Sequence, residues 1–424
     1  MKRNCHIKGL NTVQSNPAAS TYGFTYDTQG RLTNSNRYDG TSTTVSQLYT
    51  ERDISYDRNG NILTLKRISN SVPNPLHNFT YSYDGDKLTT LSGSQSGTSF
   101  TSAYTYDGNG NMTFDGNQAV RLSYHLNNLV FKTRTVSQQN QETLAGKYAY
   151  FADGTKFSLT GTDGSGRLYI GPFTLARKEY TDGTTSALTI LESADALGSD
   201  ARFTFAASPQ TISGTDTTYT IAYETLYLIK DHLGSVRTIT DSQGNVLERN
   251  DNYPYGLATN LGRNYPALAD KYRVRMPASF TDFSQNGNAY PTVSSTAGKM
   301  LPYRLLYNGK ELQLIAQTRL IDYGARQYDP TIARWNGIDL ISEDFFFLSS
   351  FVFTNNNPIC FIDENGLKWD ESSKKEADRL QREIINQIRK CFNQAVEILS
   401  QINNETVTST LNKLERESLL IICL

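Results

Sequence analysis

The chain has 424 residues, with 41 Lys and Arg against 42 Asp and Glu and a formal net charge of −1. Proteins that bind phosphate backbones usually carry a basic excess, so this balance gives no reason to expect a nucleic-acid partner. No apolar run approaches the roughly 18 residues of a spanning helix, and we expect no membrane span. The four cysteines are far apart and lack metal-ligand spacing, so we expect neither a disulfide framework nor a metal or cofactor site.

Tyrosine is the unusual component of the composition. The chain has 26 Tyr and 30 Gly, but only 2 Trp and 4 Met. Tyr and Thr favour strands, while Gly, Asn and Asp favour tight turns. The composition therefore predicts a mainly β fold of many short strands joined by turns.

A strand–turn–strand unit recurs along the first part of the chain. Its four clearest copies span residues 24–32, 54–62, 81–88 and 104–112, each with a Tyr-Asp pair. Apolar and polar residues alternate before the pair, which is the periodicity of a strand. The Asp is expected to open an Asx turn, and the Gly three residues later to adopt a left-handed conformation beside a bulge. Weaker copies continue to about residue 250, and their unequal spacing indicates hairpins with loops of different length.

One of these turns imitates the start of a calcium-binding loop. Asp107, Asn109 and Asn111 have the spacing of the first ligands of an EF-hand. Met112 stands at the sixth position instead of glycine, and Gln118 at the twelfth instead of glutamate. We therefore expect these side chains to stabilise the turn and to bind no metal.

The repeated Tyr-Asp unit resembles the YD repeat of RHS-type proteins. Four later segments resemble, in family order, the signatures of the RHS repeat-associated core. They are Asp231-His232-Leu233-Gly234-Ser235, Tyr253-Pro254-Tyr255-Gly256, the stretch from Tyr307 to Pro330, and Asn356-Asn357-Pro358 with the boundary turn at 363–366. The ordered series covers about residues 20–367.

The resemblance implies a three-part organisation. Residues 1–250 would form YD-repeat β-hairpins, which coil into a curled sheet or partial shell. Residues 251–367 would form the RHS core region, which plugs or closes one end of the shell. Residues 368–424 would be the variable C-terminal segment, often a toxin in this family. Around a hollow lumen the strands would face water on both sides, a setting that suits Tyr and Thr better than Leu and Ile.

The composition changes abruptly after the boundary. Gly and Tyr are absent from residue 368 onward, and a capping-box pattern begins at Ser373. Apolar residues then recur at steps of three and four from Ala377 to Ile402, which predicts an amphipathic helix. A second helix is expected over about 407–420. This short α-helical tail contains no nuclease, deaminase or protease motif, and its apolar stripe is more typical of core packing or a dimer seam than of a membrane-active face.

The resemblance also implies a self-cleavage site. Some RHS-type proteins cut themselves after the core with two aspartates, which correspond here to Asp339 and Asp363, with the cut after Leu367. Two neighbouring carboxyl groups can share a proton, so that one acts as acid and the other as base. Leu340 and Glu364 stand where the family pattern has prolines. A purely structural role for two turn aspartates is therefore the alternative.

A second group of residues has the chemistry of a hydrolase. His232 lies beside Asp231 and close to Ser235 in the sequence. All three fall in one tight turn, whereas a nucleophile and its base need a strained elbow and a third orienting group. We expect a structural role for these three residues. The remaining three histidines show no metal-ligand spacing.

The leading hypothesis for function is a non-catalytic shell that encloses or presents its own C-terminal effector segment in competition between bacterial cells. An immunity protein would then be a further partner. One alternative is a surface adhesin whose exposed tyrosines stack on a glycan, and another is toxin activity in the helical tail. No apolar stretch follows the basic residues Lys2 and Arg3, and we therefore expect no signal peptide in this chain. We expect a secreted or cell-surface protein that is a fragment or is exported by a dedicated system.

Overall fold

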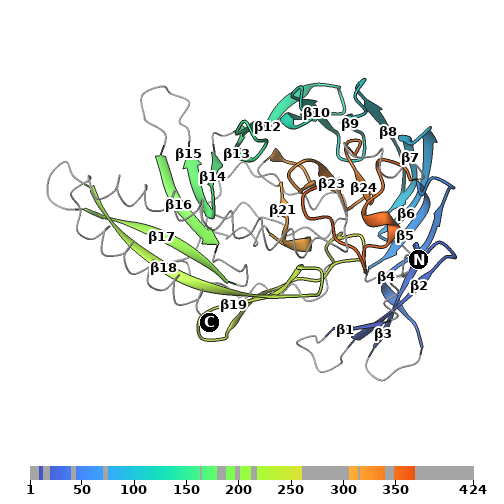
Figure 1. The fold of residues 1–424 in the computed structure, drawn as a ribbon, viewed down its shortest axis with the longest axis horizontal. Coiled ribbons are helices and arrows are strands. Elements are labelled where there is room, and N and C mark those ends of the chain that lie inside the picture. The colour runs from blue at the N-terminus through green and yellow to red at the C-terminus, as the bar shows by residue number, and fades with distance from the viewer. Residues whose placement is uncertain are drawn as a thin grey trace.

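The computed structural model describes eleven stretches of the chain, which Figure 1 shows in colour. They are residues 9–12, 20–39, 44–69, 75–162, 165–178, 188–195, 201–211, 217–259, 305–313, 316–339 and 348–367. The predicted helical tail lies outside the described residues. Among the described residues, no helix is long and apolar enough to cross a membrane.

Twenty strands form one antiparallel meander, because each strand pairs with the next along the chain. The strands are β1 (Gly9–Thr12), β2 (Ser20–Tyr26), β3 (Leu32–Asp39), β4 (Ser46–Tyr56), β5 (Ile62–Ile68), β6 (His77–Asp84), β7 (Lys87–Gln95), β8 (Thr98–Tyr106), β9 (Met112–Asp115), β10 (Val120–Tyr124), β11 (Val130–Val136), β12 (Glu142–Tyr150), β13 (Lys156–Gly161), β14 (Ser165–Ile170), β15 (Phe173–Lys178), β16 (Leu188–Asp195), β17 (Ala201–Thr211), β18 (Thr217–Lys230), β19 (Val236–Thr240) and β20 (Val246–Arg249).

The sheet curls but does not close. Figure 1 shows it bending from the blue strands β2–β8 through β10–β13 to the yellow-green strands β17–β19. Among the described residues, β1 pairs only with β2 and β20 only with β19. The predicted mainly β architecture, a curled sheet of repeated hairpins, is confirmed.

The turn of the repeat forms as its residues predict. At the β4–β5 turn, the Asp57 carboxylate accepts the backbone N–H of Asn61 at 2.8 Å. Gly60 has φ +85° and donates its N–H to the Asp57 carbonyl at 3.3 Å. The register of β4 and β5 shifts beside Tyr56, directly before the turn. In two other copies Asp27 and Asp107 also accept the N–H two residues on, each at 2.9 Å, so the repeat shows the Asx turn as well as the left-handed glycine and the bulge.

The hydroxyl of the repeat tyrosine forms a hydrogen bond that a phenylalanine ring could not form. In two of the four clearest copies, and at the equivalent ends of β10 and β12, the tyrosine hydroxyl donates to the backbone carbonyl of the first residue of the preceding strand. The pairs are Tyr56 with Leu32 at 2.5 Å, Tyr83 with Ile62 at 2.6 Å, Tyr124 with Met112 at 2.7 Å and Tyr150 with Val130 at 2.7 Å. Each bond joins two neighbouring strands at the end where the bulge interrupts the regular ladder. The repeat therefore favours tyrosine over phenylalanine at this position.

The described residues of 305–313, 316–339 and 348–367, here called the inner segment, lie inside the curl (Figure 1). They form a small antiparallel sheet and two short 3₁₀ turns. The elements are β21 (Glu311–Leu312), β22 (Ile321–Asp322), β23 (Gln327–Asp329), β24 (Arg334–Trp335), η3 (Tyr307–Gly309) and η6 (Thr354–Asn356).

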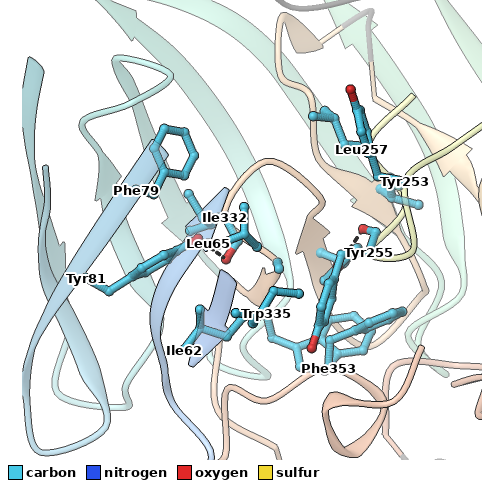
Figure 2. Close-up of a cluster of buried hydrophobic side chains, with 14 of the residues drawn as sticks. Ile62, Leu65, Phe79, Tyr81, Tyr253, Tyr255, Leu257, Ile332, Trp335 and Phe353 are labelled. Atoms are coloured by element: carbon cyan, nitrogen blue, oxygen red, sulfur yellow. Dashed lines mark hydrogen bonds between the residues drawn. The ribbon is translucent and has the colours of Figure 1, made fainter. Parts of the chain in front are cut away.

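The concave face of the sheet packs against this inner segment. Along β6, Phe79 and Tyr81 are buried while the alternating Thr80 is exposed. Figure 2 shows Phe79 and Tyr81 in one cluster of buried side chains with Ile332 and Trp335 of the inner segment. The expectation that the strands face water on both sides is therefore wrong for this part of the sheet. Apolar and aromatic side chains of the inner segment exclude water from the concave face.

The inner segment also bonds to the turns along one edge of the sheet. The Met112 N–H donates to the Asn336 carbonyl at 2.7 Å, and the Val236 N–H to the Leu306 carbonyl at 2.9 Å. The Asn356 side chain donates to the Gly60 carbonyl at 2.7 Å. These contacts extend from the β4–β5 turn to the β18–β19 turn. The inner segment thus holds widely separated hairpins in one curvature.

Candidate functional site at the C-terminal boundary

Arg326 brings the two predicted aspartates together. It lies between β22 and β23, while Asp339 follows β24 and Asp363 follows η6. Its Nη2 atom is 2.9 Å from the Asp339 carboxylate and 3.6 Å from the Asp363 carboxylate. The guanidinium carbon lies 4.3 Å from the centre of the Trp335 ring, which holds the fork in place. The two carboxyl groups therefore flank a single buried cation.

Asp363 opens the last turn that the structure describes. Its Oδ1 atom accepts the N–H of Asn365 at 3.2 Å and that of Gly366 at 2.7 Å. Gly366 has φ +76°, and a Cβ atom there would lie 2.9 Å from the backbone nitrogen of Arg326. Glycine is therefore needed at this position both for the turn and for the close approach of Arg326.

Three donors of the inner segment hold the three successive carbonyls before Leu367. We call them the boundary clamp. Lys310 Nζ donates to the Glu364 carbonyl, the Ala325 N–H to the Asn365 carbonyl at 3.0 Å, and Arg326 Nε to the Gly366 carbonyl at 2.5 Å. The clamp fixes the backbone where the chain reaches the predicted boundary.

Burial dominates the electrostatics of this site. It raises the pKa of Asp363, and the neighbouring Asp339 raises it further, while Arg326 and two backbone amides lower it. Burial also lowers the pKa of Arg326 and that of Lys310. Two carboxyl groups face one guanidinium, and burial makes Asp363 easier to protonate than an exposed aspartate. A protonated carboxyl beside a second carboxylate is the pair that acid–base hydrolysis requires.

The structure leaves the bond itself undescribed. Leu367 is the last described residue, and its N–H donates to the Asn365 side chain at 3.1 Å. Lys368, which supplies the nitrogen of the predicted scissile bond, lies outside the described residues. The structure thus describes the two carboxyl groups and the backbone up to Leu367, the residue before the predicted scissile bond.

The other sequence candidates are turns. The Asp107 carboxylate accepts the N–H groups of Asn109 and Asn111, each at 2.9 Å, and the Asn111 side chain at 3.0 Å. These bonds occupy the carboxylate within its own turn. The predicted turn role of this calcium-like segment is confirmed.

The hydrolase-like group is also structural. The Asp231 carboxylate accepts the N–H groups of Leu233 and Ser235, each at 2.9 Å. His232 Nε2 donates to the Ile359 carbonyl at 2.8 Å, whereas the Ser235 hydroxyl lies 3.3 Å from the Asn308 side chain. The ring and the hydroxyl bond to different parts of the inner segment. The expected structural role is confirmed.

Sequence reasoning missed the residues that act between distant segments. Arg326 and Lys310 both fall in the stretch that resembles the core signature, yet neither shows a spacing that assigns a role. Lys156 of β13 was also missed, although its Nζ atom bonds Glu311 at 2.7 Å and Asp322 at 2.8 Å. Such contacts join residues far apart in the chain, and no local pattern indicates them.

Comparison with known proteins gives structural neighbours only. No protein-family model matches the chain, and no curated protein matches it significantly. Among solved structures, the crystal structure of TcdB2-TccC3 is 18% identical, with a TM-score of 0.48, over 85% of this chain and 18% of that chain. The Photorhabdus luminescens Tc holotoxin pore with the mutation TccC3-D651A is 16% identical, with a TM-score of 0.47, over 86% of this chain and 18% of that chain. This chain thus spans less than a fifth of the length of either.

Proposed function

We propose that this chain is a non-catalytic part of an RHS-type β-shell that carries its own C-terminal segment, residues 368–424, as an effector. The boundary clamp is the observation that carries the proposal. It holds the carbonyls of three consecutive residues up to Gly366, directly before the abrupt change in composition. A carrier needs such an anchor, because the variable segment must be attached at a fixed place on an otherwise constant wall.

The packing of the inner segment supports the same proposal. Arg67 of β5 is fully buried and donates to the carbonyls of Pro330 and Thr331 at 3.0 and 2.5 Å. Arg334 reaches the other way and donates to the Asp86 carbonyl at 2.7 Å. The guanidinium group is a rigid fork of donors, so it can bond these carbonyls in one arrangement only. The two buried arginines therefore fix the position of the inner segment in the curl. This fixed position supports the proposal that the boundary segment is anchored to the sheet.

Toxicity tests whether the carried segment is an effector. Residues 368–424 and the full chain are expressed separately in a bacterial host that lacks any cognate immunity protein. We expect the segment alone to arrest growth and the full chain to be tolerated, or to be less toxic. Growth that both forms leave unchanged would contradict the effector role. Glycan-array binding by the full chain would then favour the adhesin.

The Asp339–Arg326–Asp363 arrangement favours a second activity, self-cleavage after Leu367. In the proposed step one carboxylate removes a proton from water, and the oxygen attacks the Leu367 carbonyl carbon. The protonated carboxyl gives its proton to the Lys368 nitrogen as the C–N bond breaks. The products are a new carboxylate at Leu367 and a free amine at Lys368. Asp363, whose pKa is raised by burial, is the proposed proton donor.

Intact mass of the purified full chain tests self-cleavage. We expect fragments 1–367 and 368–424 from the natural sequence, and the uncut chain from Asp339→Asn and Asp363→Asn. Asp251→Asn is the matched control, because Arg237 bonds Asp231 at 2.9 Å and Asp251 at 2.5 Å in a similar trio away from the boundary. An uncut natural chain, or cleavage that survives both boundary substitutions, would rule the activity out while leaving the carrier role intact.

A further inference from the structure

A second pair of buried carboxyl groups joins the sheet to the inner segment. Asp115 is the last residue of β9 and Asp329 the last residue of β23, and their exposed fractions are 2% and 1%. The Nε2 atom of Gln118 lies 3.0 Å from the Oδ2 atom of each. Because both oxygens touch one nitrogen, they lie within about 6 Å of each other, close enough for strong coupling.

The remaining polar atoms of this group are fixed. The Asp115 Oδ1 atom accepts the backbone N–H groups of Asn117 and Gln118, and the Asp329 Oδ1 atom accepts that of Thr331 at 2.7 Å. The Gln118 Oε1 atom accepts the Arg319 N–H at 2.8 Å, so its NH₂ group must face the two carboxyl groups. The Gln118 amide therefore cannot flip and present its oxygen to the two carboxyl groups.

The charged and titratable groups around Asp115 and Asp329 favour a state in which the pair keeps one proton below neutral pH. Arg319 of the inner segment is the cation that faces Asp115, and it lowers the pKa of that group. Tyr104 and Tyr106 of β8 also face it, and burial holds both phenols neutral at ordinary pH. Burial and the neighbouring Asp329 outweigh Arg319 and raise the pKa of Asp115 to about 7.

We propose that Asp115, Gln118 and Asp329 form a proton-dependent latch between the sheet and the inner segment. With one proton on the pair, a neutral carboxyl, an ionised carboxylate and a shared amide hold β9 against β23. Without that proton, two carboxylates face each other in a buried site, and the inner segment is held less tightly. The latch is tightest in acid and loosens as the pH rises toward neutrality.

The sign of the pH dependence follows from proton linkage. The pKa of Asp115 is about 7 in the closed form, against about 3.9 for a solvated aspartate. Below about pH 4 both forms hold the proton, and the latch is at full strength. Between about pH 4 and 7 the open form releases the proton and the closed form keeps it, so stability falls as the pH rises. Above about pH 7 both forms are ionised and the dependence ends.

Hydrogen exchange on the intact chain tests the latch. Backbone protection of residues 316–339 is measured from pH 4.5 to 8.5, with correction for the intrinsic exchange rate. We expect protection to fall about tenfold per pH unit up to about pH 7 and then to level off. Asp115→Asn removes the titrating group and should make the profile markedly flatter over the same range.

Asp241→Asn is the control, because Asp241 opens the exposed β19–β20 turn away from the pair. It should leave the slope of residues 316–339 unchanged. A natural chain with a flat profile in this segment, or an Asp115→Asn chain that keeps the slope, would overturn the latch. Asp329→Asn provides a second test, and if neither variant folds, the profile of the natural chain decides the matter.

Discussion

At the scale of single residues, the excess of tyrosine has two physical causes. Rings such as Tyr81 and Tyr328 fill the core between the sheet and the inner segment. Hydroxyls such as that of Tyr150 satisfy a carbonyl beside the bulge of the neighbouring hairpin. Phenylalanine could fill the core as well as tyrosine does, but it could not bond to the carbonyl. A buried carbonyl left without a hydrogen-bond partner lowers the stability of the folded protein.

Two substitutions separate the ring from the hydroxyl. Tyr150→Phe removes the bond to the Val130 carbonyl at 2.7 Å and should lower the free energy of unfolding by about 1 to 2 kcal/mol. Tyr104→Phe is the control, because the Tyr104 hydroxyl is buried without a hydrogen-bond partner among the described residues. Removing that hydroxyl should be neutral or stabilising in urea denaturation. Equal destabilisation by the two changes would show that the hydroxyl bond is not what the repeat selects.

At the scale of elements, the sequence predicts what neighbouring residues determine. The turn at Asp57 and Gly60 follows from local side-chain bonding and from the conformational freedom of glycine. The alternation along β6 follows from the two faces of a strand. Strand, turn and bulge could therefore be placed from a stretch of about ten residues, without knowledge of the rest of the chain.

Contacts between distant elements could not be predicted in the same way. The sequence indicated that Asp339 and Asp363 belong together, through the resemblance alone. It did not indicate that Arg326 lies between them, since this depends on how β22 and β23 pack against the last turn. The expectation of a wet inner face failed for the same reason. Which face of the sheet is covered depends on an inner segment that follows the strands by more than fifty residues.

At the scale of the whole molecule, the curl and the inner segment form one unit through buried polar contacts. One cation of the sheet, Lys156, is nearly buried between Glu311 of β21 and Asp322 of β22. Tyr169 of β14 adds a bond to Glu311 at 3.0 Å. Contacts of this kind require a single placement of the inner segment, since a displaced carboxylate would remain buried without its cation.

Replacing Lys156 tests how much this arrangement depends on its cation. Lys156→Met leaves the carboxylates of Glu311 and Asp322 buried and facing each other, and should cost about 3 to 5 kcal/mol of unfolding free energy. Lys147→Met changes an exposed lysine of the neighbouring strand β12 and should cost less than about 0.5 kcal/mol. Adding Glu311→Gln and Asp322→Asn to Lys156→Met should restore part of the loss, because it removes the unpaired charges. A Lys156→Met chain as stable as the Lys147→Met chain in urea would mean that this group of charges contributes little to holding the inner segment in the curl.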